Sequence, residues 1–339
     1  MWFVSKKIEI KPGEVIEMNG IAKTMDNLIS EMNCDFITYK PEKTRINLPV
    51  LRNALDLKLT AMTEASLKQV ISKMKYKHDI NQNMKKFVHA LIGKDDEIVE
   101  AVLKHFVWQS KRKMFGLEVY DHLMPILYGS TQRQGKSSAV RKFLSPINGL
   151  WCNAKLCDIS DERKAKMFSN NFGAFFDEMQ GASKLDMECI KERITSEFIS
   201  FRALFTNVVS QLKNNSTPIG VANKPLALIL RDSTGMRRFF EIEISKRCDW
   251  DAMNKIDFLA LWQDIDEKQD IPYIEQFRSK IEAHQELSRD KCSVEQWIDE
   301  HELTPGEIKN ILNDVYSHYC HFCSNSGVYA DSKNASSMN

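Results

Sequence analysis

The chain has 339 residues, which corresponds to about two domains of ordinary size. Its 47 Lys and Arg residues balance 46 Asp and Glu residues, so the formal charge of +1 excludes a general polyanion binder, and any nucleic-acid site must be a local patch. With 43% hydrophobic and 27% charged residues and only 13 Gly and 9 Pro, the composition excludes disordered and collagen-like chains.

The termini and the cysteines indicate a compartment. No apolar run approaches the ~20 residues that a membrane span requires. The N-terminus places four apolar residues before its first lysines, which is the wrong order for a secretory signal. The eight cysteines are scattered along the chain, so a disulfide framework is not expected. We therefore expect a cytoplasmic protein without contact to a membrane.

Helical patterns dominate the beginning of the chain. Apolar residues recur at helical spacing between Leu48 and Met84, and residues 1–90 are predicted to form a mostly helical N-terminal region for oligomerisation or DNA binding. A further helix is predicted from about Asp96 to Arg112, because its apolar residues repeat at three and four. This helix leads into a strand.

Short apolar runs then alternate with helical stretches, which predicts an α/β core over residues 91–247 with a mostly parallel sheet. The runs are Leu123 to Tyr128, Phe172 to Phe176, Ile219 to Ala222 and Phe239 to Ile244. Beyond Arg247 the helical patterns return, so residues 248–339 are predicted as a helical C-terminal region.

The strongest chemical signal is a turn between an apolar strand and an amphipathic helix. It comprises Gly129, Ser130, Thr131, Gln132, Arg133, Gln134, Gly135, Lys136, Ser137 and Ser138. In a phosphate loop the backbone N–H groups and the helix N-terminus bind phosphate, the lysine reaches the terminal phosphates, and the serine binds Mg²⁺.

The spacing of this loop departs from the strict pattern, in which four residues separate the glycines. Here five residues lie between Gly129 and Gly135. We expect an ATP-binding loop that is one residue longer, or one in which Ser130 takes the place of the first glycine. The alternative is a chance Gly-Lys-Ser sequence at an ordinary helix start.

Polar residues end two later strands. Asp177 and Glu178 follow a buried-type strand, and in a nucleotide-hydrolysing site the Asp helps to bind Mg²⁺ while the Glu polarises the attacking water. Asn223 ends the next strand, where an amide can orient that water, although an Asn in this position is more often a turn former. Adjacent Arg237 and Arg238 precede the last strand and are candidates to stabilise charge on a transferred phosphoryl group, from this subunit or from a neighbour.

The order of these signals resembles the virulence-associated protein E family, related to superfamily 3 helicases and other AAA+ ATPases of phages, plasmids and chromosomal islands. The similarity covers about residues 86–246. Its motifs are Asp177-Glu178, Ile190-Lys191, Phe201-Arg202, Gly220 to Asn223, Asp232-x-Thr234-Gly235-x-Arg237-Arg238-Phe239 and, upstream, Trp108 to Arg112 with His122 to Leu127.

The resemblance implies an AAA+ core and an ATP- and Mg²⁺-dependent DNA helicase or replication motor. Such a protein acts on single-stranded or forked DNA as a homo-oligomer, typically a hexameric ring, and contacts host or element replication proteins. It implies a role for each candidate residue: Lys136 contacts phosphates, Ser137 and Asp177 bind Mg²⁺, Glu178 is the base, Asn223 is the first sensor, and Arg237 or Arg238 is the arginine finger.

Further expectations concern DNA contact and chain extent. In related ring motors a hairpin before the first sensor lines the pore, and here that stretch is Phe205 to Thr217. We expect Lys213, Asn214 and Asn215 at its tip to contact DNA phosphates. We interpret Lys111 to Lys113 as a solvated face, with DNA or nucleotide contact as the alternative. The N-terminal region is too short for the primase domain of larger relatives, and the C-terminus resembles the beginning of a truncated winged helix.

Three other functions stay open. An AAA+ initiator or helicase loader would have the same ATP site without processive unwinding. A small-molecule P-loop kinase is disfavoured by the arginine pair and by the Asp-Glu tandem, which are typical of hydrolysis between subunits. A structural module in which the longer loop no longer binds ATP is the third.

Overall fold

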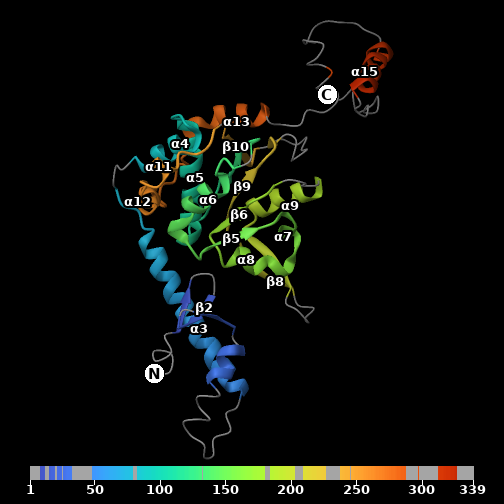
Figure 1. The fold of residues 1–339 in the computed structure, drawn as a ribbon. Helices are drawn as coiled ribbons and strands as arrows, with labels where there is room; N and C mark the ends of the chain where they lie inside the picture. Colours follow the sequence, from blue (N-terminus) through green and yellow to red (C-terminus); the bar gives the residue numbers. More distant parts are fainter. Residues whose placement is uncertain are drawn as a thin grey trace, which may run out of the picture.

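The computed structural model describes most of the chain. The described residues are 8–11, 15–19, 21–24, 26–32, 48–78, 82–131, 133–179, 184–202, 209–226, 237–244, 246–287, 297 and 312–326. Within them, the central feature is a parallel β-sheet with helices on both faces (Figure 1). The predicted α/β class with a parallel-type sheet and flanking helices is confirmed.

Five parallel strands form the sheet in the order β10-β4-β9-β6-β5. Their bounds are β4 Met124–Tyr128, β5 Trp151–Ala154, β6 Gly173–Phe176, β9 Thr217–Ala222 and β10 Phe239–Glu243. The chain enters at β4, moves outward to β5, returns through β6 and β9, and ends at β10 on the opposite side of β4. The strand order changes direction beside β4, and open α/β sheets bind ligands at the carboxyl ends of the strands next to such a point.

Alternating strand residues face two separate hydrophobic clusters, as the pleat of a strand requires. Leu127, Phe175 and Val221 belong to the larger cluster, while Phe176 and Ala222 belong to the smaller one. The larger cluster includes residues of α4 Asn83–Ile92, α5 Glu97–Met114, α6 Lys136–Phe143, η1 Ser145–Ile147, α11 Trp250–Met253, α12 Phe258–Gln263 and α13 Arg278–Leu287. The smaller one includes residues of α7 Leu156–Ser160, α8 Ala165–Ser169, α9 Lys184–Thr195 and β7 Phe198–Arg202.

The larger cluster crosses both predicted domain boundaries. Phe87 of α4 stacks on Phe143 of α6 with ring centroids 5.0 Å apart. Trp262 of α12 donates its indole N–H to the Phe143 carbonyl over 2.9 Å and is fully buried. The packed unit therefore begins before residue 91 and continues past residue 247, with 3-10 helices η2 Glu162–Lys164 and η3 Glu275–Phe277 as connections.

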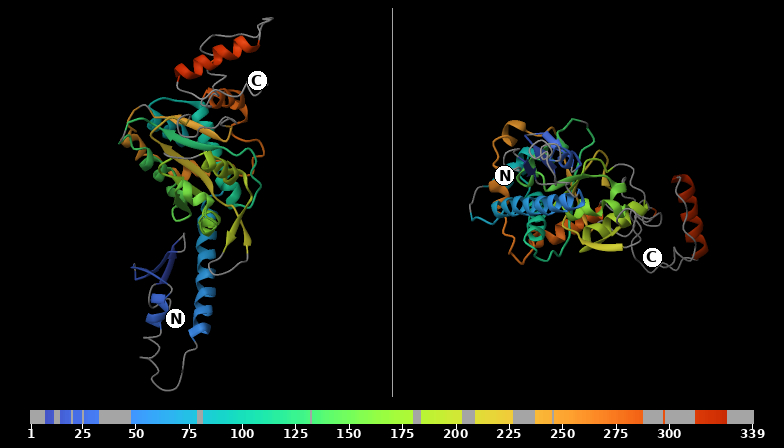
Figure 2. Two further views of the ribbon diagram at one scale, coloured as in Figure 1. Left: turned by 90° about the vertical axis from the view of Figure 1, so that its right-hand side faces the viewer. Right: turned by 90° about the horizontal axis from the view of Figure 1, so that it is seen from below.

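The N-terminal region contains a sheet that the helical patterns did not predict. Strands β1 Ile8–Lys11, β2 Val15–Met18 and β3 Ile21–Lys23 form an antiparallel meander, which contacts α3 Leu48–Lys73. Figure 2 shows α3 extending from the core with this sheet beside it. The prediction of helix is therefore wrong over these strands, although α3 itself confirms the helical pattern between Leu48 and Met84.

At the other end of the chain, α15 Leu312–Ser326 lies apart from the five-stranded sheet (Figure 1).

The interpretation of Lys111 to Lys113 as a solvated face is wrong. Lys111 is fully buried, and its Nζ lies 2.9 Å from Glu267 Oε2 and donates to the carbonyl of Trp262. Arg112 is buried over the Trp108 ring and donates to the Glu267 carbonyl. These cations are buried because α5 lies between the sheet and the segment that follows α12.

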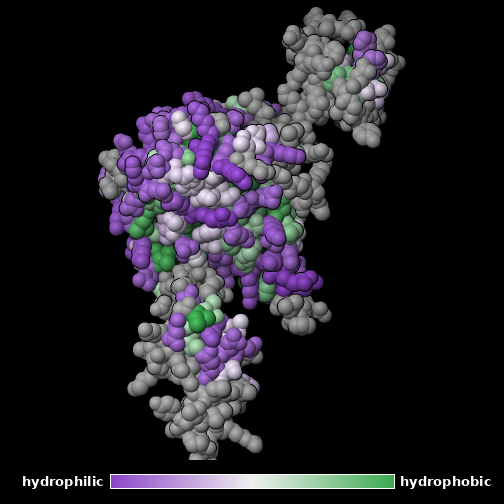
Figure 3. Space-filling model, viewed as in Figure 1, coloured by the Kyte–Doolittle hydropathy of each residue, from purple (hydrophilic) through white to green (hydrophobic). Residues whose placement is uncertain are grey.

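The described surface has the character expected from the composition. On the face shown in Figure 3, hydrophilic residues cover most of the core. Among the described helices, none combines the length and the apolar character needed to cross a membrane.

Candidate functional site

The predicted phosphate loop lies at the carboxyl edge of the sheet. It leaves β4 after Tyr128, and the Gly129 N–H donates to the Ala222 carbonyl at the end of β9 over 3.3 Å. Helix α6 begins at Lys136, after Gly135 with φ 95°, and no side chain caps its first turn. Uncapped N–H groups at a helix start can bind an anion.

Lys136 is held inside this loop. Its side chain is 6% exposed, and its Nζ donates to the Gly129 carbonyl over 2.5 Å and lies 3.3 Å from Gln134 Oε1. Burial lowers the pKa of Lys136 below its ordinary value. The Lys136 ammonium thus contacts oxygen acceptors of the loop, and a phosphate oxygen is an acceptor of the same kind.

The inserted residue of the loop is accommodated by Gln134. This side chain is buried, and its Nε2 donates to the Ile244 carbonyl after β10 over 2.7 Å. A Cβ atom on Gly129 would lie 2.1 Å from Gln134 Oε1 and 2.8 Å from the Ile244 carbonyl oxygen, and because the latter is backbone, only glycine fits there. Arg133 adopts the left-handed conformation at φ 63°, which is uncommon for a residue other than glycine. Gln134 thus attaches the longer loop to the segment that follows β10.

Cys248 and Trp250, in the segment that follows β10, also contact the phosphate loop. The sequence did not predict either contact. The Cys248 N–H donates to the Gln134 carbonyl over 3.0 Å. A Cβ atom on Gly135 would lie 2.7 Å from Cζ2 of Trp250, which shows that the indole packs against the loop. Neither residue carries a motif, and only their position after β10 brings them here.

The acidic pair and Asn223 end strands that neighbour the loop. In the register, Tyr128 pairs with Ala222 and Phe176 with Gly220, so the ends of β4, β9 and β6 lie side by side. Asp177 lies against α6, because its Oδ2 is 2.6 Å from Nη2 of Arg141. The structure therefore brings Lys136, Asp177 and the neighbouring strand ends to one edge, with Glu178 exposed beside them.

The oxygen donors at this edge are compatible with Mg²⁺ only together with a nucleotide. Within the described parts of the chain, no group of three His, Cys, Asp or Glu residues is arranged to hold a metal ion. Ser137 and Asp177 offer one hydroxyl and one carboxylate, and Mg²⁺ in nucleotide sites commonly takes one or two protein oxygens, with waters and phosphates supplying the rest. The chemistry of the donor set therefore fits a metal delivered with ATP.

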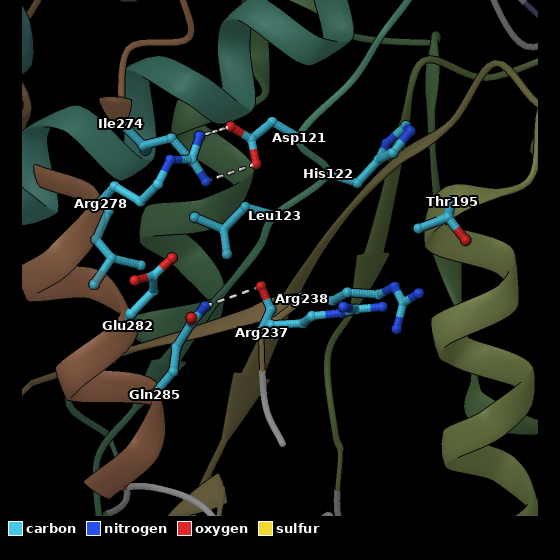
Figure 4. A pocket seen from close by; sticks show the side chains of 11 residues that line it. Asp121, His122, Leu123, Thr195, Arg237, Arg238, Ile274, Arg278, Glu282 and Gln285 are labelled. Carbon is cyan, nitrogen blue, oxygen red and sulfur yellow. Dashed lines mark hydrogen bonds and ion pairs between the residues drawn. The ribbon is translucent and has the colours of Figure 1, made fainter. Parts of the chain in front are cut away.

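The two arginines lie at the opposite edge of the sheet. Phe239 pairs with Met124 at the amino ends of β10 and β4, so Arg237 and Arg238 precede the sheet and are roughly 15–20 Å of strand away from the loop. They line a cavity of about 360 Å³ together with His122 and Gln285. Figure 4 shows both arginine side chains extending toward α9. The structure does not bring them to the phosphate loop of the same chain.

The placement of the DNA-contact residues at a hairpin tip is wrong. Lys213 ends β8 Val209–Lys213 and pairs with Phe198, the first residue of β7, so it lies at the base of the hairpin. Asn214 is buried, and its amide donates to the carbonyls of Arg193 and Ser196. The Asn215 amide donates to the Ser169 carbonyl over 2.7 Å. Residues 203–208, which connect β7 to β8 in the chain, lie outside the described residues, as does Gln132 of the loop.

Comparison with known proteins identifies the class. The family model of the virulence-associated protein E-like domain matches residues 71–288, which is more than half of the chain. The chain therefore belongs to the virulence-associated protein E-like domain family.

Solved structures with a similar fold include the C-terminal region of NrS-1. One apo structure has 13% sequence identity and a TM-score of 0.49, covering 76% of this chain and 62% of that chain. An A-form apo structure has 15% identity and a TM-score of 0.46, covering 67% of this chain and 56% of that chain. The chain thus spans less than two thirds of these structures. No curated protein matches it.

Proposed function

We propose that this chain is an AAA+ ATPase that works as a DNA helicase or replication motor of a mobile genetic element. It hydrolyses ATP at the interfaces between the subunits of a ring and acts on single-stranded or forked DNA. The observation that carries the proposal is the meeting of the phosphate loop, the Asp177-Glu178 pair and Asn223 at one edge of a parallel sheet.

Each residue at this edge has a role that follows from its position. Lys136 and the first N–H groups of α6 bind the terminal phosphates, and Ser137 and Asp177 bind Mg²⁺. Glu178 polarises the attacking water, and Asn223 orients it. The metal bound with ATP supplies charge neutralisation on the phosphates.

The arginines support a ring rather than a monomer. Arg237 and Arg238 lie at the amino edge and the phosphate loop lies at the carboxyl edge, so an arginine reaches a phosphoryl group only in a neighbouring subunit. Contacts between two different edges of one chain are head-to-tail, and they close into rings when the rotation permits. A homohexamer is the assembly that we propose, with host or element replication proteins as further partners.

A forked-duplex assay with purified protein tests the proposal. We expect ATP- and Mg²⁺-dependent strand separation by the wild type, and loss of both nucleotide binding and separation in Lys136→Ala, because the phosphate-binding ammonium is removed. Lys164→Ala, at an exposed lysine on the other face of the sheet, serves as the matched control.

Other outcomes distinguish the alternatives. ATP hydrolysis that DNA stimulates, without strand separation, would favour an initiator or helicase loader with the same site. Absence of nucleotide binding by the wild type at millimolar ATP would contradict the proposal.

A further inference from the structure

Arg141 connects the phosphate-loop helix to the acidic pair. It lies four residues after Ser137 on α6, so the two side chains share one face of the helix. Its Nη2 is 2.6 Å from Asp177 Oδ2, and its guanidinium carbon lies 5.5 Å from the centroid of the Phe175 ring. The guanidinium thus contacts both an aromatic ring and a carboxylate.

The direction of Asp177 follows from the strand before it. Phe175 faces the cluster that contains Val140 of α6, and side chains two residues apart in a strand point to the same side. Asp177 continues this side just beyond β6, toward the helix that carries Ser137 and Arg141. The ion pair engages one oxygen of Asp177, and a carboxylate retains a second oxygen with which to accept further bonds.

A role in folding alone does not account well for this ion pair. The side chains of Arg141 and Asp177 are 46% and 39% exposed, and exposed ion pairs contribute little to stability. By contrast, groups that orient a metal-binding carboxylate typically change metal affinity 10- to 100-fold when they are removed.

We propose that Arg141 is a positioning residue that orients the Asp177 carboxylate toward the Mg²⁺ of a bound nucleotide. This inference rests on the proposed function, because it requires a magnesium-nucleotide site at this edge of the sheet. It assigns to α6 both a phosphate-binding end and, one turn later, the group that orients the metal-binding acid.

Calorimetric titration of ADP at a series of Mg²⁺ concentrations tests the inference without measuring turnover. In Arg141→Ala we expect the Mg²⁺ concentration that half-maximally tightens ADP binding to rise about 10-fold or more. ADP affinity in EDTA is expected to stay within about twofold of the wild type. Arg141→Lys retains a cation and is expected to be intermediate.

Two further variants complete the test. Lys142→Ala removes the adjacent cation of α6 and is expected to behave like the wild type. Asp177→Ala is expected to lose most of the Mg²⁺ effect, and adding Arg141→Ala to it should have little further effect, because both changes act on one interaction.

The outcomes separate this inference from the proposed function. Equal weakening of ADP binding with and without Mg²⁺ in Arg141→Ala would overturn the positioning role, as would an unchanged Mg²⁺ dependence in a variant with the thermal stability of the wild type. A wild type that binds ADP with Mg²⁺ but separates no strands would overturn the helicase proposal alone. A wild type that binds no nucleotide would overturn both.

Discussion

Gln134 explains how a phosphate loop can be one residue longer than the strict pattern. Its side chain turns inward, occupies the space beside Gly129 and bonds to the Ile244 carbonyl. The longer loop therefore has a buried polar side chain that attaches it to the segment after β10. An unpaired buried amide is costly, and both of its ends find partners here, the carbonyl of Ile244 and the ammonium of Lys136.

Glu178→Gln is expected to separate nucleotide binding from hydrolysis. The amide has the shape of the carboxylate but cannot accept a proton, so ADP binding should stay near the wild-type value while the turnover number falls about 10²- to 10⁴-fold. Steady-state ATPase assays and calorimetry measure the two quantities. Glu192→Gln, at an exposed acid on α9, is the matched control, and unchanged turnover in Glu178→Gln would show that another group activates the water.

Some residues of the candidate site could be predicted from the sequence because they belong to a local pattern. Others could not, because contacts between distant segments place them. Lys136 and Asp177 were predicted because each stands in a local pattern, a strand followed by a turn or by acids. Trp250 and Arg141 were not predicted, because their positions depend on packing between segments that are distant in sequence. Lys213 was misplaced because the strand it ends pairs with β7, which puts Lys213 opposite Phe198 at the base of the hairpin.

Helix α5 shows why an amphipathic pattern predicts a helix better than it predicts its surroundings. The predicted helix from about Asp96 to Arg112 agrees with α5 within two residues at each end, and Asp96 caps it by accepting from the N–H groups of Ile98 and Val99. Yet the polar residues His105 and Gln109 are also buried, since the helix is covered on several sides. The Gln109 amide donates to the Leu123 carbonyl before β4, and the His105 ring stacks on Trp108.

The burial of His105 predicts a pH dependence of stability. Burial lowers the pKa of His105 from 6.5 to about 4. Between these values the unfolded chain binds more protons than the folded one, so the free energy of unfolding falls as the pH falls from 6.5 toward 4. We expect His105→Gln to reduce this loss by on the order of 1–2 kcal/mol at pH 5 relative to pH 7.5.

Urea unfolding at a series of pH values measures this effect. His78→Gln, at an exposed histidine, is expected to leave the profile unchanged. An identical acid loss in His105→Gln and the wild type would show that His105 does not govern it.

The strands differ in how well they could be predicted. The runs that became β4, β6, β9 and β10 are apolar and central or well covered, so they stand out in the sequence. Strand β5 is short, lies at the edge of the sheet and includes the exposed polar residue Asn153, so its pattern is weak. The hairpin β7–β8 is mostly exposed, and the family resemblance placed a hairpin at Phe205 to Thr217, several residues later than the structure does.

For the whole molecule, the packed unit and the matched family unit coincide. Helices α4 to α13 and the sheet span residues 83–287, and the family model matches residues 71–288. The helices after β10 are therefore part of the unit that carries the site, because Trp262 and Cys248 pack within the same cluster as the sheet. The return of helical patterns beyond Arg247 led to the prediction of a separate region from residue 248, since helices that cover a sheet resemble a separate helical region.

The separation of the two sheet edges predicts complementation between inactive subunits. Arg237→Ala and Glu178→Gln proteins, or Arg238→Ala and Glu178→Gln proteins, are each expected to hydrolyse ATP poorly alone. In an equal mixture, about a quarter of head-to-tail interfaces combine an intact Glu178 with an intact arginine from the neighbour. Partial recovery of ATPase activity in the mixture is expected, and the absence of recovery with either arginine variant would argue against a shared site.

The indole that packs on Gly135 has a practical consequence. Trp250 is one of six tryptophans, but it lies against the hinge at which the loop becomes a helix. The loop cannot shift there without moving the ring or opening a gap beside it. We therefore expect the fluorescence emission of Trp250 to change when the loop moves, without any attached dye.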